Sequence, residues 1–311
     1  LNKSPNTVKE YNYDLAHFLK YISFKYKLTD VKDEEFIKKI KINNFDLKTL
    51  EKISLPDIHS FLSYLKTCYN CKPATLARKT ASIKVFFKYM RNKTKKIPTN
   101  PAQDLETPKI GKRLPKYLTL EESKELLEAT ASLEGHGNHD NAERNFAMIT
   151  ILLNCGVRLS ELVGINISDI DFENNKMNVI GKGDKERTIY LNNACMKAIN
   201  KYLEVRPRDG VKFNSRDALF LSEQKKRISK RTVQYIVKNE LRNAGIEKAN
   251  TYSVHKLRHT AATLMYKYGN VDIRALQELL GHESISTTEI YTHVDNEQIR
   301  NAVENNPLAN L

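Results

Sequence analysis

The sequence has no tryptophan, only four cysteines and no long apolar segment. Four cysteines in 311 residues are too few for a disulfide scaffold, so we expect a reducing cytosolic setting. The longest apolar runs are about five residues, whereas a transmembrane helix needs roughly 20. The first residues also lack the apolar core of a signal peptide. We therefore expect a cytoplasmic protein without a membrane span.

Acidic residues are also scarce relative to basic ones. The chain holds 37 Asp+Glu against 51 Lys+Arg, a formal net charge of +14. Residues 1–110 carry 22 basic and 11 acidic side chains, whereas residues 111–311 carry 29 and 26. So uneven a charge indicates a polyanionic partner bound by the first third of the chain, with double-stranded DNA as the first candidate. A lysine-rich solvated surface is the alternative interpretation.

The pattern of apolar residues predicts a helical first domain over residues 1–107. Helices are expected from Pro5 to about Ile22, over Asp33–Ile42, from Pro56, and after Pro73. The last helix has one apolar stripe, and its other face carries the predicted DNA-contacting residues Arg78, Lys79 and Lys88. Four prolines at 98, 101, 108 and 115 then indicate an extended connection. We assign the linker to 108–117, where Lys112 and Arg113 are further candidates for phosphate contacts.

A second domain is predicted over residues 118–311. A capping box, Thr119 with Glu122, begins its first helix. Further helices are expected over Asn141–Cys155, shortly after Arg158, and over Asn193–Val205, Thr232–Ala244, Ser253–Tyr268, Ile273–Leu280 and Asp295–Glu304. Strands over Lys176–Ile180 and Arg187–Leu191 flank a glycine-containing turn. The fold class is therefore mainly α with a small antiparallel β-sheet of about three strands.

Several residues of the second domain could carry chemistry, although each has an ordinary structural interpretation. His255 and Arg258 are three residues apart on a predicted helix and so share one face. Arg158 begins a helix, with Glu161 placed to orient it. Lys182 lies between two glycines in a turn that can approach a ligand closely. Taken singly, a surface basic cluster, a helix start and an exposed turn lysine explain these residues equally well.

Together and in this order, the motifs resemble those of the tyrosine recombinase (phage integrase) family, especially its Xer branch. The matching segments are Gly156-Val-Arg158-Leu-Ser-Glu-Leu162, Gly181-Lys182-Gly-Asp-Lys-Glu-Arg187, His255-Lys-Leu-Arg258-His259, Leu279-Leu-Gly-His282 and Thr288-Glu-Ile-Tyr291. The resemblance covers nearly the whole chain. It implies a helical core-binding domain and an α+β catalytic domain that form a C-shaped clamp on DNA. A charged insertion near residues 31–54 and a longer loop at 131–141 depart from the family pattern.

The resemblance also implies a mechanism. Tyr291 would be the nucleophile that forms a 3′-phosphotyrosyl bond, and Lys182 the general acid. Arg158, Arg258 and His282 would bind the phosphate, His255 would act as acid or base, and Glu161 would support them. No metal and no cofactor are implied. The active form would be a homotetramer, or a heterotetramer with a paralogue, on two DNA duplexes, with the helix at about 295–304 exchanged between protomers. A DNA translocase or an accessory protein is a possible further partner.

Other functions stay open at this stage. A mobile-element integrase has a similar catalytic domain. We expect no arm-binding domain ahead of the helical one, and this expectation favours Xer-like resolution of chromosome or plasmid dimers. A type IB topoisomerase uses a similar site without exchanging strands. A non-catalytic DNA-binding protein is the alternative from another class. The pairs Cys68/Cys71 and His136/His139 lack further ligands at metal-binding spacing, so we expect no metal there.

Overall fold

The computed structural model describes residues 5–31, 34–42, 45–108, 116–132, 139–181, 185–269 and 271–281. It divides into two units, Leu1–Lys112 and Arg113–Leu311, here called the N-terminal unit and the C-terminal unit. The dividing point lies within the segment 108–117. In the described part of the chain, no helix is long and apolar enough to cross a membrane.

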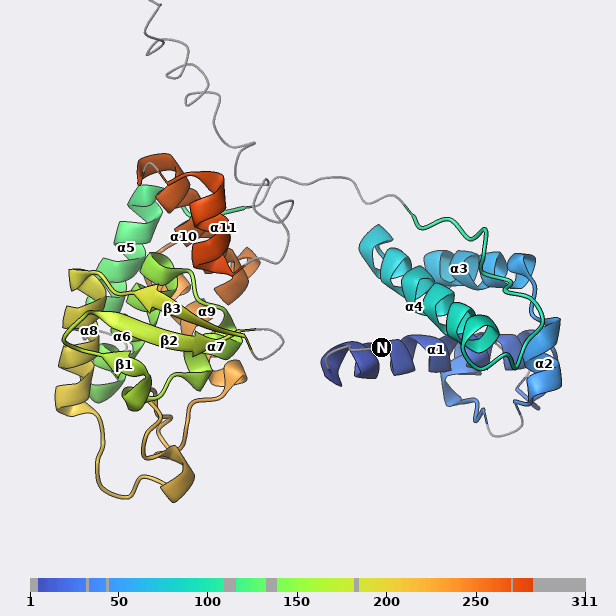
Figure 1. Cartoon of the computed structure of the whole chain (residues 1–311), viewed down its shortest axis with the longest axis horizontal. Helices are drawn as coiled ribbons and strands as arrows, with labels where there is room; N and C mark the ends of the chain where they lie inside the picture. Colours follow the sequence, from blue (N-terminus) through green and yellow to red (C-terminus); the bar gives the residue numbers. More distant parts are fainter. Residues whose placement is uncertain are drawn as a thin grey trace, which may run out of the picture. The chain divides into compact units, whose positions relative to one another are not determined.

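The N-terminal unit is helical (Figure 1). Its elements are α1 (Pro5–Lys25), the 3-10 helix η1 (Glu34–Lys39), α2 (Leu47–Lys52), α3 (Leu55–Tyr69) and α4 (Pro73–Asn92). Proline begins α4 and stands second in α3, where its missing N–H leaves no helical bond unmade. The core combines aliphatic side chains with aromatic rings, and Phe18, Phe61 and Phe87 are fully buried on α1, α3 and α4.

Two expectations for this unit were wrong in detail. The helix expected over Asp33–Ile42 is only the short η1, and α2 was not predicted. The proline-containing stretch does not leave the unit at residue 98, because Ile97, Ala102 and Leu105 are buried in its core. Lys84 Nζ also donates to the Leu105 carbonyl at 2.7 Å. Prolines here shape a strap over the helices rather than an extended connection.

The C-terminal unit combines helices with one small sheet (Figure 1). Its helices are α5 (Leu120–Ala131), α6 (His139–Cys155), α7 (Leu159–Gly164), α8 (Asn193–Val205), α9 (Lys230–Asn243), α10 (Val254–Tyr268) and α11 (Ile273–Leu280), with short 3-10 turns η2 (Ile167–Asp169), η3 (Phe213–Ser215) and η4 (Ala249–Thr251). The strands β1 (Ile170–Asp171), β2 (Lys176–Ile180) and β3 (Glu186–Tyr190) are antiparallel in the order β1-β2-β3. The predicted capping box of Thr119 and Glu122 is confirmed. The fold is mainly α with a small antiparallel sheet, as expected.

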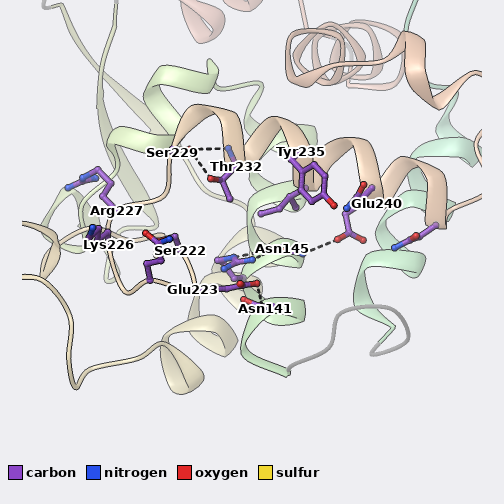
Figure 2. Close-up of a pocket in the computed structure, with 15 residues that line it drawn as sticks. Asn141, Asn145, Ser222, Glu223, Lys226, Arg227, Ser229, Thr232, Tyr235 and Glu240 are labelled. Atoms are coloured by element: carbon purple, nitrogen blue, oxygen red, sulfur yellow. Dashed lines mark hydrogen bonds between the residues drawn. The ribbon is translucent and has the colours of Figure 1, made fainter.

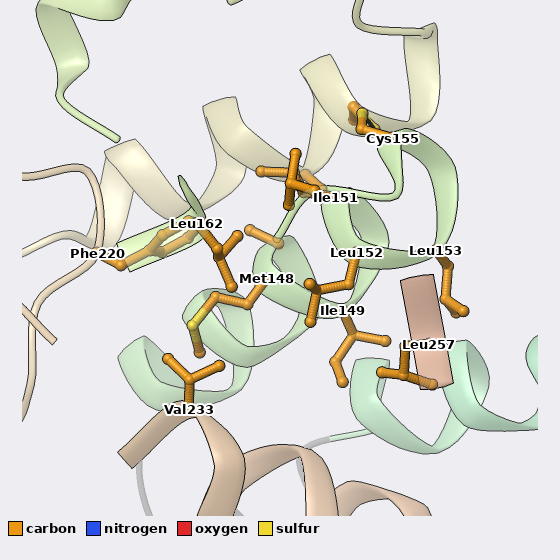
Figure 3. Close-up of a cluster of buried hydrophobic side chains, with 14 of the residues drawn as sticks. Met148, Ile149, Ile151, Leu152, Leu153, Cys155, Leu162, Phe220, Val233 and Leu257 are labelled. Carbon is orange, nitrogen blue, oxygen red and sulfur yellow. Dashed lines mark hydrogen bonds between the residues drawn. The ribbon is translucent and has the colours of Figure 1, made fainter. Parts of the chain in front are cut away.

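Helix α6 forms the centre of this unit. Met148, Ile149, Ile151 and Leu152 are fully buried on several sides of the helix, as Figure 3 shows, because other helices surround it. The buried face of the sheet adds Met177, Val179 and Ile189. Since α6 ends at Cys155 and α7 begins four residues later, this rigid helix fixes the position of the loop that carries Arg158.

Candidate active site

The centre of the site is the carboxylate of Glu161, whose side chain is completely buried. Oε1 accepts a hydrogen bond from Arg158 Nη1 at 2.7 Å, and Oε2 accepts one from the Arg158 backbone N–H at 2.7 Å. Arg187 binds both oxygens, with Nη1 2.5 Å from Oε1 and Nη2 2.9 Å from Oε2. Burial alone raises the pKa of Glu161, but hydrogen bonds from Arg187 and Arg158 outweigh it and lower that pKa. The carboxylate therefore stays ionised and joins the start of α7 to β3.

A turn at Gly156 places Arg158 beside the Glu161 carboxylate. Gly156 has a φ of +58°, and a Cβ there would lie 3.0 Å from Leu280 Cδ2, so any other residue would be both strained and crowded. The chain then enters α7 with Arg158 at the N-cap position. With a side chain 29% exposed, against 3% for Arg258, Arg158 is the more accessible of these two arginines.

Arg258 lies on α10 and is buried beside the same carboxylate. Its Nη1 donates to the Gly156 carbonyl at 2.6 Å and lies 4.0 Å from Glu161 Oε2. Nη2 donates to the Leu280 carbonyl at 2.5 Å. The structure thus brings together Arg158, Glu161 and Arg258, three of the residues that the sequence predicted for the site.

Three arginines hold the C-terminal end of α11. Arg187 Nε donates to the Leu279 carbonyl at 3.3 Å, Arg258 to Leu280, and Arg158 Nη2 to Gly281 at 2.5 Å. The last carbonyls of a helix have no partner within it and carry partial negative charge, which cations stabilise. Figure 1 shows α11 above β3 in the C-terminal unit. The residue that follows this end in sequence is His282.

His255 lies on α10 one turn before His259, with the two ring centroids 4.6 Å apart. Its side chain is exposed. Protein packed around the ring lowers the pKa of His255, and the charges of Arg258 and Arg158 lower it further. Burial and the neighbouring His255, Arg258 and Lys256 lower the pKa of His259 to about 4. Both imidazoles are therefore neutral at neutral pH, a state in which a ring nitrogen can accept a proton.

Lys182, His282 and Tyr291 lie outside the described residues, and so does the helix predicted at about 295–304. The base of the turn that carries Lys182 is described. Gly181 N–H donates to the Lys185 carbonyl at 2.7 Å, which closes the turn. A Cβ on Gly181 would lie 3.6 Å from Glu161 Oε1. The turn therefore begins directly beside the central carboxylate.

The predicted DNA contacts of the N-terminal unit differ in their surroundings. Lys88 is exposed on α4. Arg78 contacts Asp14 and, at 3.2 Å, Glu10. Lys79 is buried with its Nζ 2.8 Å from Asp14, so the prediction that Lys79 contacts DNA does not fit this geometry. Lys112 and Arg113 lie outside the described residues.

Arg187 was not predicted as a site residue. It occurs within the recognised segment around Lys182, but its neighbours on β3 resemble an ordinary polar strand. One signal was available: strand alternation places Arg187 on the same face as the buried Ile189, where a charged side chain needs a partner. The partner, Glu161, is 26 residues away in sequence, and local periodicity cannot reveal such a contact.

A separate cavity of about 610 Å³ lies between α6, α9 and the segment 222–229 (Figure 2). Arg144 donates to the Leu221 carbonyl and to Asn145 Oδ1, and Asn145 donates to Glu240 at 2.9 Å. This buried network ties α6 to α9, and none of the site residues above lines the cavity. Cys68 and Cys71 form no disulfide, and the described residues contain no group of three or more metal-ligating side chains.

Comparisons with known proteins agree with this geometry. Residues 116–298 match the model of the phage integrase family. The chain is 52% identical to the tyrosine recombinase XerC of Caldanaerobacter subterraneus subsp. tengcongensis, over 99% of this chain and 83% of the relative. It is 35% identical to the tyrosine recombinase XerD of Listeria monocytogenes, over 94% and 89% of the two chains.

Solved structures give the same answer for the fold. The XerH recombinase bound to its difH substrate in a post-cleavage complex aligns with a TM-score of 0.68 at 22% identity, covering 94% of this chain and 95% of that one. The XerA recombinase aligns with a TM-score of 0.52 at 28% identity, covering 97% and 91%. The chain therefore belongs to the phage integrase family, as a tyrosine recombinase of the Xer-like branch.

Proposed function

We propose that this site-specific recombinase cuts and rejoins DNA through a 3′-phosphotyrosyl bond made by Tyr291. The observation that supports this proposal most is the convergence of Arg158 and Arg258 on Glu161, with His255 alongside. Two guanidinium groups held in place beside a neutral imidazole suit a backbone phosphate that gains charge in the transition state.

In the proposed reaction, the Tyr291 oxygen attacks the phosphorus, and the bond to the 5′ oxygen breaks. Arg158, Arg258 and His282 bind the non-bridging oxygens. Lys182 gives a proton to the departing 5′ oxygen, and His255, with its lowered pKa, takes part in proton transfer near the tyrosine. Attack by a 5′-hydroxyl from another strand reverses the steps, so the bond energy is conserved and no cofactor is needed.

The biological role proposed is resolution of chromosome or plasmid dimers at the nucleoid. It follows the XerC and XerD relatives. Recombination would join two duplexes through a homotetramer, or a heterotetramer with a paralogue, whose protomers exchange the segment at about 295–304. A DNA translocase or accessory protein would set when exchange occurs. Integration or excision of a mobile element is the second candidate, and the mapped DNA site separates the two.

The test begins with fragmented genomic DNA from the source organism. Covalent protein–DNA complexes are trapped, and sequencing of their ends maps the site. On a nicked duplex carrying that site, the native protein should give a covalent band on a denaturing gel. Tyr291→Phe should bind equally and give none, and a 5′-bridging phosphorothiolate should rescue Lys182→Ala. A covalent band from Tyr291→Phe overturns the proposal, and relaxation without two-site recombination indicates a topoisomerase.

A further inference from the structure

Arg187 occupies an unusual position for a charged residue. It pairs with the buried Val179 of β2, on the sheet face that packs into the core. Its side chain is only 14% exposed. A guanidinium held there loses its hydrogen bonds to water, and hydrogen bonds within the protein must replace them. Those bonds go to both oxygens of Glu161 and to the Leu279 carbonyl.

The three arginines around Glu161 differ in how closely they bind its carboxylate and in how exposed they are. Arg187 binds the carboxylate through two nitrogens, whereas Arg158 contacts it with one guanidinium nitrogen and Arg258 stays 4.0 Å away. Arg158 is also the most exposed of the three, at 29% against 14% and 3%. Arg187 is therefore placed to neutralise the carboxylate, and Arg158 is placed to meet a substrate.

Charge balance gives this division a consequence. Without Arg187, the carboxylate would be bonded to Arg158 alone and would cancel one of the two remaining positive charges, those of Arg158 and Arg258. With Arg187 present, three guanidinium charges face one carboxylate, so one more positive charge remains for a phosphate. Low local dielectric makes this excess count for more than it would in water.

We infer that Arg187 is a positioning residue, which offsets the charge of Glu161 so that Arg158 keeps its own for the scissile phosphate. It also fixes the end of α11 that leads to His282. The inference rests on the proposed function, since it assigns Arg158 to the phosphate. Arg187 itself does not touch DNA in this scheme.

The test compares single-turnover cleavage and binding on the nicked duplex for Arg187→Met and Arg187→Lys. Arg187→Met should bind DNA within about twofold of the native protein and cleave about 10²-fold more slowly, the usual scale for loss of a preorganised electrostatic group. Arg187→Lys keeps the positive charge, so its cleavage rate should fall only about tenfold. Arg206→Met is the matched control, because Arg206 is another buried arginine whose bonds all go to backbone carbonyls, among them Leu219 and Ala218. It should lower the melting temperature without a selective loss of cleavage.

The decisive variant is Glu161→Gln combined with Arg187→Met. If Arg187 offsets the carboxylate, removing that charge should make the double variant cleave at least about fivefold faster than Arg187→Met alone, measured on folded protein saturated with DNA. A purely structural role would instead restore the melting temperature, because no unpaired buried charge remains, and leave the cleavage rate of the folded protein unchanged. The groups facing Glu161 are the guanidinium groups of Arg158 at the start of α7, Arg187 on β3 and Arg258 on α10. In Arg187→Met, burial should raise the pKa of Glu161. The cleavage deficit relative to the native protein should then narrow as pH falls.

Two results overturn the inference: native-like cleavage by Arg187→Met, or no gain from adding Glu161→Gln. Tyr291→Phe in the same assay keeps the two proposals apart. A covalent band from Tyr291→Phe contradicts the proposed function, because Tyr291 would not be the nucleophile. If Tyr291→Phe gives no covalent band and Arg187→Met cleaves at the native rate, only the role inferred for Arg187 is contradicted.

Discussion

Each unit of this recombinase contains a carboxylate that is almost fully buried among basic side chains. In the N-terminal unit, Asp14 of α1 accepts hydrogen bonds from Arg78 and Lys79 of α4. In the C-terminal unit, Glu161 faces Arg158, Arg187 and Arg258. Both clusters pair one buried carboxylate with basic side chains, yet one joins two helices and the other forms the proposed active site.

The difference lies in where the basic groups direct their remaining donors. The compact ammonium of Lys79 is bound to Asp14, and among the described residues Arg78 reaches beyond Asp14 only to Glu10 on the same helix α1. Each arginine around Glu161 has a planar fork that also reaches a carbonyl at the end of α11. Of these two sets of cations, only those around Glu161 have donors that also reach a helix end next to predicted site residues.

The largest effect should come from removing the carboxylate of the C-terminal unit. Glu161→Ala leaves three guanidinium groups close together without a counter-charge. We expect single-turnover cleavage to fall by about 10²–10³-fold. Chemical denaturation should show a loss of about 3–5 kcal/mol in the free energy of unfolding. Glu173→Ala, in an exposed turn, is the control and should change neither. Native-like cleavage by Glu161→Ala would show that the two carboxylates are both merely structural.

The matching change in the N-terminal unit should affect stability alone. Asp14→Ala leaves Lys79 buried without its partner, which should cost about 3 kcal/mol in the unfolding of that unit. Adding Lys79→Met should recover most of the loss, because no buried charge remains. Calorimetry measures both variants. Cleavage per bound complex should stay at the native level, and a fall in it would contradict the contrast drawn above.

The smallest effect concerns exposed against buried lysines on α4. Lys88→Ala should weaken DNA binding a few-fold at low salt and reduce the slope of log affinity against log salt by about one contact. Lys79→Met should leave that slope unchanged, because Lys79 is already bonded to Asp14. Titrations at several salt concentrations measure both slopes. An equal change in the two slopes would mean that α4 rearranges when DNA binds.

Local signals in the sequence were enough to predict most elements of the fold. Thr119 with Glu122 predicted the start of α5, and the alternation on either side of Gly181 predicted the two longer strands. The buried side of α4 was harder to predict. Lys79 lies four residues before Ile83, and so on the same side of α4 as the apolar stripe. The sequence prediction weighed the charge of Lys79 and not this spacing, and nothing local showed that Asp14 of α1 would meet its ammonium there.

Long-range pairing explains what the sequence could not predict in the site. Arg158, Glu161, His255 and Arg258 were named from motifs, but no local rule joins Arg187 to Leu279, 92 residues later. The salt bridge of Asp14 with Arg78 likewise spans 64 residues. Such contacts depend on how elements pack, which only the folded chain determines.

The packing of α11 has a consequence for the thermal inactivation of the enzyme. Its apolar contacts belong to a small cluster, Ala262, Leu276 and Leu280, apart from the main core around α6. Segments with few buried contacts open at a lower free energy than the whole domain. When α11 opens, Arg158 and Arg258 lose the carbonyls that align them, although α6 and the sheet stay folded. The temperature of inactivation should therefore lie below that of global melting, and its midpoint reports the local stability of one helix.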